Sequence, residues 1–483
     1  MKESGVLMPM FSLPSKNGVG DMGEGAYEFV DILAESGITI WQILPLNPAG
    51  YGNSPYQPYS SYAGDNIYIN LELLKRDGLI KSDIPDFLRA ANRVDYKAVR
   101  NFKEPFFAEA FKNFKGNEEF LSFAKQKWVR QYCTYAAIRK SEGGKCWIDW
   151  KEELKNYPEK EIKLSDEIER EIEYNIFLQY EFYIQWRNIK KYANEKGIRI
   201  MGDVPFYVGL DSADVWSNKK NFLLDDDGRP SFVAGVPPDY FSKTGQRWGN
   251  PIYDWDYIKK DNFKFWTDRM GFSAELFDII RIDHFRAFDT YWSIPSDCPT
   301  AIDGEWIENC GYEAIEEIKK NISAAELVAE DLGELRQEVI ELRDNFNLKG
   351  MKVLIFCLNL DSKCASDSFE KKENLIVYTG THDNDTVIEW YEKLSTAKKR
   401  KLRRFFRRNN LKEGTLNDKM ILYALKSEAQ YAIISMPDLL ALGREGHINT
   451  PGTVGSPNWE YREPDFSRIK GAFKRYSPYI NRK

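Results

Sequence analysis

Short apolar segments rich in β-branched residues recur along the chain, and each is followed by a polar or Gly/Pro break and then by a helical pattern. This alternation is typical of parallel βα units, in which a helix follows every strand. Eight such units predict an α/β fold, a TIM (β/α)8 barrel, with any active site at the carboxyl ends of the strands. The eight predicted strands are Gly5–Phe11, Ile38–Leu44, Ile198–Val204, Ile279–His284, Glu326–Glu330, Met351–Cys357, Leu375–Thr379 and Ala432–Met436.

The connection between the second and third predicted strands, residues 50–197, is far longer than a βα crossover requires. Its later part is charged, and apolar residues from Ile172 to Ile184 recur at helical spacing before Gly197 ends the pattern. We therefore expect a large, mainly helical insertion on one side of the barrel. Residues 1–72 and 190–483 are predicted to form the barrel with its loop subdomains, and residues 73–189 the helical insertion subdomain.

One strongly basic run, Lys398–Arg408, allows two interpretations. It could form a patch for an anionic ligand or RNA, or it could be the solvated face of a helix. We favour the second, because Leu402, Phe405 and Phe406 have the spacing of a face turned inward.

Composition narrows the class of protein. The chain has 483 residues, 42% of them hydrophobic, which is enough for a folded core, and its net charge of −6 argues against a nucleic-acid partner. We expect neither a signal peptide nor a membrane span. The cysteines are sparse and form no CxxC pair, which indicates a reducing compartment and a cytoplasmic location. They are Cys133, Cys146, Cys298, Cys310, Cys357 and Cys364.

Aromatic residues make up 14% of the chain. Sugar rings present apolar faces that stack on aromatic rings, so enzymes that act on glycans often carry such an excess. Ordinary packing of aromatic side chains in the core is the alternative, and composition alone does not decide between them.

Four carboxylates follow predicted strands, so they would surround one mouth of the barrel. Asp203, Asp283 and Glu330 end the third, fourth and fifth strands, and Asp383 follows the seventh. Cleavage of a glycosidic bond with retention needs one carboxylate as the nucleophile and a second carboxyl as the general acid and base. Taken singly, each residue could instead cap a helix or form an Asx turn.

Arg281 lies two residues before Asp283. On a strand both side chains would share a face, which would place the guanidinium to keep Asp283 ionised. Crowded negative charge would at the same time raise the pKa of the carboxyl that must stay protonated.

Two of the three histidines, His284 and His382, adjoin the proposed catalytic aspartates, and the third is His447. They lack the spacing of known zinc ligands, so we predict no metal and assign them to hydrogen bonds with sugar hydroxyls. No cofactor is expected, because neither a P-loop nor a GxGxxG motif after a strand is present.

Several segments together resemble known families. The segments 281–286, 329–333 and 381–385 are similar to signature regions of the α-amylase clan. The chain further resembles the narrower amylomaltase, or 4-α-glucanotransferase, family from residue 8 to residue 462. The segments that carry this second resemblance are Ser12-Leu13-Pro14 with 18–23, then 41–46, Ser54-Pro55-Tyr56-Gln57, 235–242, 245–251, 449–453 and Asn458-Trp459.

The resemblance implies roles for the matched residues. Asp283 would be the nucleophile, Glu330 the general acid/base, and Asp383 would bind sugar hydroxyls and help to distort the ring at the cleavage subsite. The remaining implied substrate-binding residues are Arg281, His382, Asp203, Tyr56 and Asn458, together with Tyr240, Phe241 and Trp248 on the acceptor side.

The expected reaction is transfer of an α-1,4-glucan segment from a maltooligosaccharide or starch donor to glucose or another glucan. Transfer requires a bound acceptor and exclusion of water, and the apolar loop Gly235–Pro251 could supply the lid for both. An ordinary surface loop is the alternative. A hydrolase of the same clan and a non-catalytic glycan-binding barrel are the competing functions. The oligomeric state is not predicted.

Overall fold

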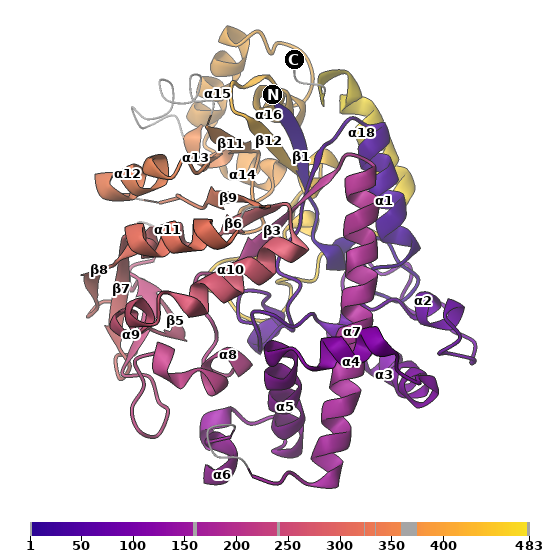
Figure 1. Cartoon of the computed structure of the whole chain (residues 1–483). Helices are drawn as coiled ribbons and strands as arrows, with labels where there is room; N and C mark the ends of the chain where they lie inside the picture. The colour runs from indigo at the N-terminus through magenta and orange to yellow at the C-terminus, as the bar shows by residue number, and fades with distance from the viewer. Residues whose placement is uncertain are drawn as a thin grey trace.

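The computed structural model of the chain describes residues 2–157, 162–238, 242–322, 324–333, 335–358 and 374–480. Eight parallel strands form a barrel at its centre, in the order β10-β11-β12-β1-β2-β3-β6-β9 (Figure 1). A parallel bridge between Val328 and Lys349 brings the two end strands together and closes the barrel. The strands are β1 (Glu3–Leu7), β2 (Ile40–Gln42), β3 (Arg199–Val204), β6 (Ile279–Ile282), β9 (Glu326–Ala329), β10 (Gly350–Val353), β11 (Leu375–Tyr378) and β12 (Tyr431–Ser435).

Each of the eight predicted segments overlaps one barrel strand, so the predicted TIM barrel is confirmed. Several predicted strands extend beyond the observed ones, and the first and the sixth do so by four residues at their carboxyl ends. The first ends at Leu7, because Pro9 lacks a backbone N–H and the chain turns into a 3-10 helix at Met10–Ser12. The sixth ends at Val353, where the apolar run continues as a short helix, α13 (Leu354–Cys357). Apolar character alone cannot distinguish these two continuations from a strand.

The connection from β2 to β3 is mainly helical, as predicted. It contains α2 (Leu71–Arg76), α3 (Tyr96–Asn113), α4 (Glu118–Ala124), α5 (Lys127–Ser141), α6 (Glu152–Lys155) and the long α7 (Asp166–Glu195).

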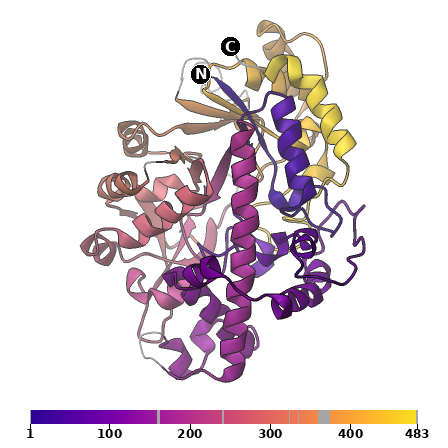
Figure 2. The same cartoon turned by 45° about the vertical axis from the view of Figure 1, so that its right-hand side comes forward.

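Ser165 caps the start of helix α7, because its hydroxyl accepts a hydrogen bond from the Ile168 N–H. The helix then runs along much of the height of the molecule (Figures 1 and 2), packing against α5 at one end and α1 (Glu24–Glu35) at the other. This helix therefore crosses the predicted boundary between residues 189 and 190. The division into a barrel of residues 1–72 and 190–483 and a subdomain of residues 73–189 stays a prediction.

A second, antiparallel sheet of four strands, in the order β5-β4-β7-β8, was not predicted from the sequence. Its strands are β4 (Phe232–Val236), β5 (Gln246–Pro251), β7 (Thr290–Pro295) and β8 (Glu305–Glu308). They come from the connections that follow β3, which carries Asp203, and β6, which Asp283 follows directly. The sheet therefore belongs to the mouth of the barrel.

Helices surround the barrel, and the two ends of the chain meet on one side of it. Helix α18 (Phe466–Ile480) lies beside α1 (Figure 2), to which Lys470 forms an ion pair with Glu28 at 2.7 Å. The Ser4 hydroxyl donates to the Ile480 carbonyl at 2.7 Å. The remaining helices are α8 (Ala213–Ser217), α9 (Trp255–Lys260), α10 (Lys264–Leu276), α11 (Gly311–Asn321), α12 (Gln337–Asn345), α14 (Val387–Lys393), α15 (Thr396–Arg408), α16 (Leu416–Lys426) and α17 (Met436–Leu439).

The structure assigns many of the aromatic residues to the core, including five fully buried tryptophans: Trp41, Trp147, Trp186, Trp216 and Trp266. The basic run lies on α15, where Leu402 and Phe406 are buried and Phe405 is half-buried against Tyr423. The interpretation of this run as a solvated helix face is confirmed. Among the helices that the structure describes, none combines the length and apolar character that a membrane-spanning helix needs.

Candidate active site

Asp283 and Glu330 lie at the ends of neighbouring barrel strands. Ile282 of β6 is paired with Ala329 of β9, and each carboxylate residue follows directly. His284 adopts a left-handed backbone conformation (φ 53°), and its N–H donates to Glu330 Oε2 at 2.8 Å. The Leu332 N–H donates to Glu330 Oε1 at 3.1 Å. Backbone groups therefore fix the Glu330 carboxyl beside the chain segment that carries Asp283.

Arg281 links Asp283 to a third carboxylate, that of Asp203. Its guanidinium Nη1 lies 2.6 and 2.7 Å from the two oxygens of Asp203, and 3.0 Å from Asp283 Oδ1. Arg281 and Asp203 face each other because they are paired in the register of β3 and β6. The Asp203 side chain is completely buried, whereas that of Asp283 is 27% exposed. The buried ion pair therefore supports a carboxylate that a substrate can reach.

Tyr56 connects this ion pair to the opposite side of the site. Its hydroxyl donates to Asp203 Oδ2 at 2.7 Å, and its ring stacks on His382 with centroids 5.0 Å apart and an interplanar angle of 14°. Trp459 packs against both rings, with centroids 5.6 Å from Tyr56 and 5.8 Å from His382. Three aromatic rings thus form one wall of the site.

Asp383 follows β11 and is held from two directions. His382 Nε2 lies 3.3 Å from Asp383 Oδ2, and the Asn449 side-chain amide donates to Asp383 Oδ1 at 2.6 Å. The Asp383 side chain is 42% exposed. Its carboxylate is therefore oriented by neighbours and remains open to a ligand.

The protein shifts the pKa values of these carboxyl groups in different directions. Burial, opposed by Arg281 and reinforced by Asp283, raises the pKa of Glu330 to about 7. Burial also raises the pKa of Asp283, with Arg281 opposing. For Asp383 the effect of burial is outweighed by His382 and Asn449, so that its pKa is lowered to about 2. Near neutral pH the site therefore combines a fixed anion with a carboxyl that can hold a proton.

Trp248 of β5 faces the same region from the second sheet. Its ring meets that of His284 edge to face, with centroids 4.9 Å apart and an interplanar angle of 88°. Asn458 is buried, accepts from the Thr450 N–H at 3.0 Å and donates to Thr453 Oγ1 at 2.9 Å, so it holds the neighbouring loop. Two predicted residues, Tyr240 and Phe241, lie outside the residues that the structure describes.

Comparison with known proteins shows the family to which the chain belongs. The sequence model of a family described as 4-alpha-glucanotransferase matches residues 8–466, almost the whole chain. The chain belongs to the 4-α-glucanotransferase family. It is an enzyme that transfers glucan segments, and its substrates are α-glucans. The expectation of a transferase is confirmed, and the hydrolase and the non-catalytic barrel are not favoured.

Individual relatives support the same assignment. The chain is 39% identical to a 4-alpha-glucanotransferase of Aquifex aeolicus, with 98% of both chains covered. It is 41% identical to that of Clostridium butyricum, covering 95% of this chain and 96% of the relative. The structure superimposes on an amylomaltase from Streptococcus agalactiae, solved in complex with acarbose, with a TM-score of 0.91, 35% identity and both chains fully covered.

Sequence reasoning missed two contributors to the site of this 4-α-glucanotransferase. Asn449 and Trp459 were noted only as parts of family-like segments, without a role. Both lie more than 60 residues after Asp383 in the chain, and only the fold brings them to it. The Asn449 N–H donates to the His382 carbonyl at 3.0 Å, and the Trp459 N–H donates to the Ile448 carbonyl at 2.7 Å.

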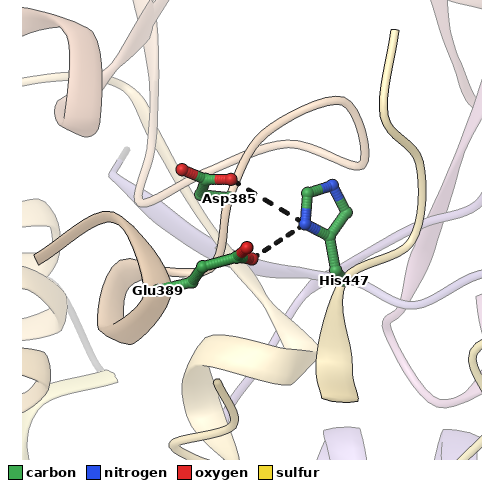
Figure 3. A group of neighbouring side chains, drawn as sticks. All are labelled: Asp385, Glu389 and His447. Atoms are coloured by element: carbon green, nitrogen blue, oxygen red, sulfur yellow. Dashed lines mark hydrogen bonds and ion pairs between the residues drawn. The ribbon is translucent and has the colours of Figure 1, made fainter. Parts of the chain in front are cut away.

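The structure also brings together Asp385, Glu389 and His447, a set that the sequence did not indicate (Figure 3). Ligand atoms of these three residues lie within 4.8 Å of one another, which is compatible in principle with a metal ion. The Lys393 ammonium, however, lies 2.7 Å from Asp385 Oδ1 and 3.1 Å from Glu389 Oε1. In this glucanotransferase a lysine ammonium therefore already bridges the two carboxylates that a metal ion would bind.

Proposed function

We propose that this 4-α-glucanotransferase works by a retaining double displacement, in which Asp283 is the nucleophile and Glu330 the general acid/base. The observation that carries the proposal is their position at neighbouring strand ends, with Arg281 bound to Asp283 and a raised pKa at Glu330. Retaining glycosidases use a pair of carboxyl groups divided in this way.

In the first step, Asp283 attacks the anomeric carbon of the donor and forms a glycosyl ester. Glu330 gives its proton to the departing glycosidic oxygen, so the leaving segment departs with a free 4-hydroxyl. In the second step, ionised Glu330 takes the proton from the 4-hydroxyl of an acceptor. That oxygen attacks the same carbon and releases Asp283, so two inversions give net retention.

Asp383 is proposed to bind hydroxyls of the sugar at the cleavage point, where its ionised carboxylate stabilises the distorted ring. His382 and Tyr56, stacked beside it, are proposed to line the same subsite. Asp203 is fully buried and occupied by Arg281 and Tyr56. We therefore propose that Asp203 and Arg281 orient the reacting groups, with Arg281 keeping Asp283 ionised.

The acceptor side is proposed to include Trp248, Tyr240 and Phe241, and Asn458 is proposed to contact the sugar. The contact of Trp248 with His284, next to Asp283, supports this assignment for Trp248. A lid built on the segment Gly235–Pro251 would hold the acceptor and exclude water from the glycosyl ester. Both effects favour transfer, because an oriented hydroxyl has a much higher effective concentration than water.

Further expectations belong to the proposal. We infer an α-1,4-glucan donor and glucose or a maltooligosaccharide as the acceptor, without a nucleic-acid or membrane partner. A cytoplasmic location is supported by the free thiols of four described cysteines: Cys133, Cys146, Cys298 and Cys310.

The experiment is incubation of the pure enzyme with maltotriose. Two molecules should yield glucose and maltopentaose, and the total number of reducing ends should stay constant. Asp283→Asn should abolish the reaction while the thermal unfolding transition is retained. A rising number of reducing ends would indicate hydrolysis, and full activity of Asp283→Asn would exclude this residue as the nucleophile.

A further inference from the structure

The side-chain cluster of Asp385, Glu389 and His447 (Figure 3) is linked to Asp383 through Asn449. Asp385 is in the loop after β11, Glu389 is on α14, and His447 follows the 3-10 turn Arg444–Gly446. His447 Nδ1 is 2.8 Å from Glu389 Oε2 and 3.8 Å from Asp385 Oδ1. The exposed fractions of the Glu389 and His447 side chains are only 10% and 15%. The imidazole is thus enclosed between elements that follow two different barrel strands.

The second ring nitrogen of His447 also faces an acceptor, since Nε2 lies 2.6 Å from the Asn449 carbonyl oxygen. A carboxylate and a carbonyl both accept hydrogen bonds, and only an imidazolium has a proton on each nitrogen to donate to them. A histidine that binds a metal must instead offer a lone pair. With Lys393 on the other side of the carboxylates, the contacts fit a hydrogen-bonded cation rather than a metal ligand.

His447 thereby fixes Asn449, which in turn binds Asp383. The Asn449 carbonyl is bound by His447, and its N–H donates to the His382 carbonyl at 3.0 Å. With both sides of its backbone fixed, Asn449 directs its side-chain amide to Asp383 Oδ1 at 2.6 Å. The other carboxylate oxygen lies 3.3 Å from His382 Nε2. One continuous chain of contacts therefore runs from α14 through His447 and Asn449 to Asp383.

We propose that His447 is a positioning residue for glucan transfer, which links Glu389 on α14 to Asn449 and so fixes the Asp383 carboxylate at the cleavage subsite. The inference rests on the proposed function, because it takes Asp383 to bind the sugar in the transition state.

The framework behind Glu389 is rigid enough for this task. Helix α14 is capped by Thr386, whose hydroxyl accepts from the Glu389 N–H at 3.2 Å. The buried Asp438, which follows β12, accepts from the Val387 N–H at 2.8 Å and from the Thr379 hydroxyl at 2.7 Å. These hydrogen bonds attach α14 to the ends of β11 and β12. Through Glu389, His447 and Asn449, the position of Asp383 therefore depends on the barrel strands.

The inference is tested with His447→Leu, which keeps bulk and removes both donors. We expect kcat for maltotriose to fall about 10-fold to 100-fold, as small displacements of a reacting group do, while KM changes less than about twofold. Such a split follows because a contact made mainly in the transition state is lost. Glu389→Gln should lower kcat in the same direction. His447→Gln, which keeps an N–H donor, should recover part of the lost rate.

A matched control separates positioning from general destabilisation. Arg475 binds the buried carboxylate of Asp418 at 2.6 Å, which links α18 to α16. Arg475→Leu removes a cation from a buried carboxylate and should lower the unfolding temperature without changing kcat.

Unchanged kcat in His447→Leu would overturn the inference, and so would equal losses of kcat in His447→Leu and Arg475→Leu. Asp383→Asn separates the positioning role of His447 from the sugar-binding role of Asp383. If Asp383→Asn is inactive and His447→Leu is fully active, the inference alone fails. If Asp383→Asn is fully active, the proposed role of Asp383 fails with it.

Discussion

Glu330 and Asp383 are carboxyl groups of one site whose pKa values are shifted in opposite directions. The two side chains differ in their neighbours. Glu330 accepts from the backbone N–H groups of His284 and Leu332 and lies near the negative charge of Asp283, whereas Asp383 lies beside His382 and Asn449. A proton is therefore retained at Glu330 under conditions in which Asp383 is ionised.

The first prediction concerns pH. Transfer should decline as the pH rises through about 7, since the raised pKa of Glu330 marks where the proton donor for the first step is lost. The logarithm of kcat/KM for maltotriose, measured between pH 5 and pH 9 (about two pH units on either side of this pKa), should fall on the alkaline side with a slope approaching one.

The Glu330→Gln variant tests the assignment of this alkaline limb. It should lower kcat for maltotriose by about 10²-fold to 10⁴-fold, the usual contribution of a general acid. Maltosyl fluoride needs little protonation of its leaving group, so its first-turnover fluoride release should be largely retained. An alkaline limb that persists in this release would assign the titration to another group.

At the scale of single elements, β3 shows how a backbone position sets the site. Gly202 stands between the core residue Met201 and the site residue Asp203. A Cβ added to Gly202 would lie 2.2 Å from the ring of Phe277, which is itself buried against Trp186. The absence of a side chain therefore lets Phe277, which follows α10, pack directly on the strand that carries Asp203.

We predict that Gly202→Ala lowers the free energy of unfolding by about 1–3 kcal/mol, the usual cost of overpacking a core. Gly271→Ala, in the interior of α10, is the matched control, since nothing lies within 4 Å of its added Cβ. It should raise stability by about 0.4–1 kcal/mol. Urea unfolding measures both variants, and a neutral Gly202→Ala would show that Phe277 can move aside.

At the same scale, the apolar pattern of the sequence predicted some elements and failed to predict others. All eight barrel strands could be predicted because parallel strands buried on both faces produce apolar runs. The end of β10 could not, since α13 continues the same apolar run as a helix. The second sheet was missed because β8, with three of its four residues exposed, and the half-polar β5 carry no apolar run.

At the scale of the whole molecule, the barrel brings elements from distant parts of the chain to one mouth, including the cluster of Asp385, Glu389 and His447. We predict that dialysis against EDTA leaves kcat for maltotriose unchanged, because Lys393 and His447 already bind the two carboxylates. Loss of activity that Ca²⁺ or Zn²⁺ restores would show that the cluster holds a metal ion instead.

The sequence by itself determined the barrel, the helical insertion and the carboxylates at the strand ends. Strand periodicity is local, and in a parallel barrel every residue that follows a strand at its carboxyl end reaches the same mouth. Arg281 could be placed beside Asp283 for the same reason, since an offset of two residues on a strand is a local relation.

Only the tertiary structure decided which distant groups orient those carboxylates. Asn449 binds Asp383 directly, Trp459 packs against the adjoining His382, and His447 holds Asn449. These contacts join loops, whose paths depend on packing and follow no periodic pattern in the sequence. The tertiary structure also decides the pKa shifts of Glu330 and Asp383, because burial and neighbouring charge exist only once the chain has folded.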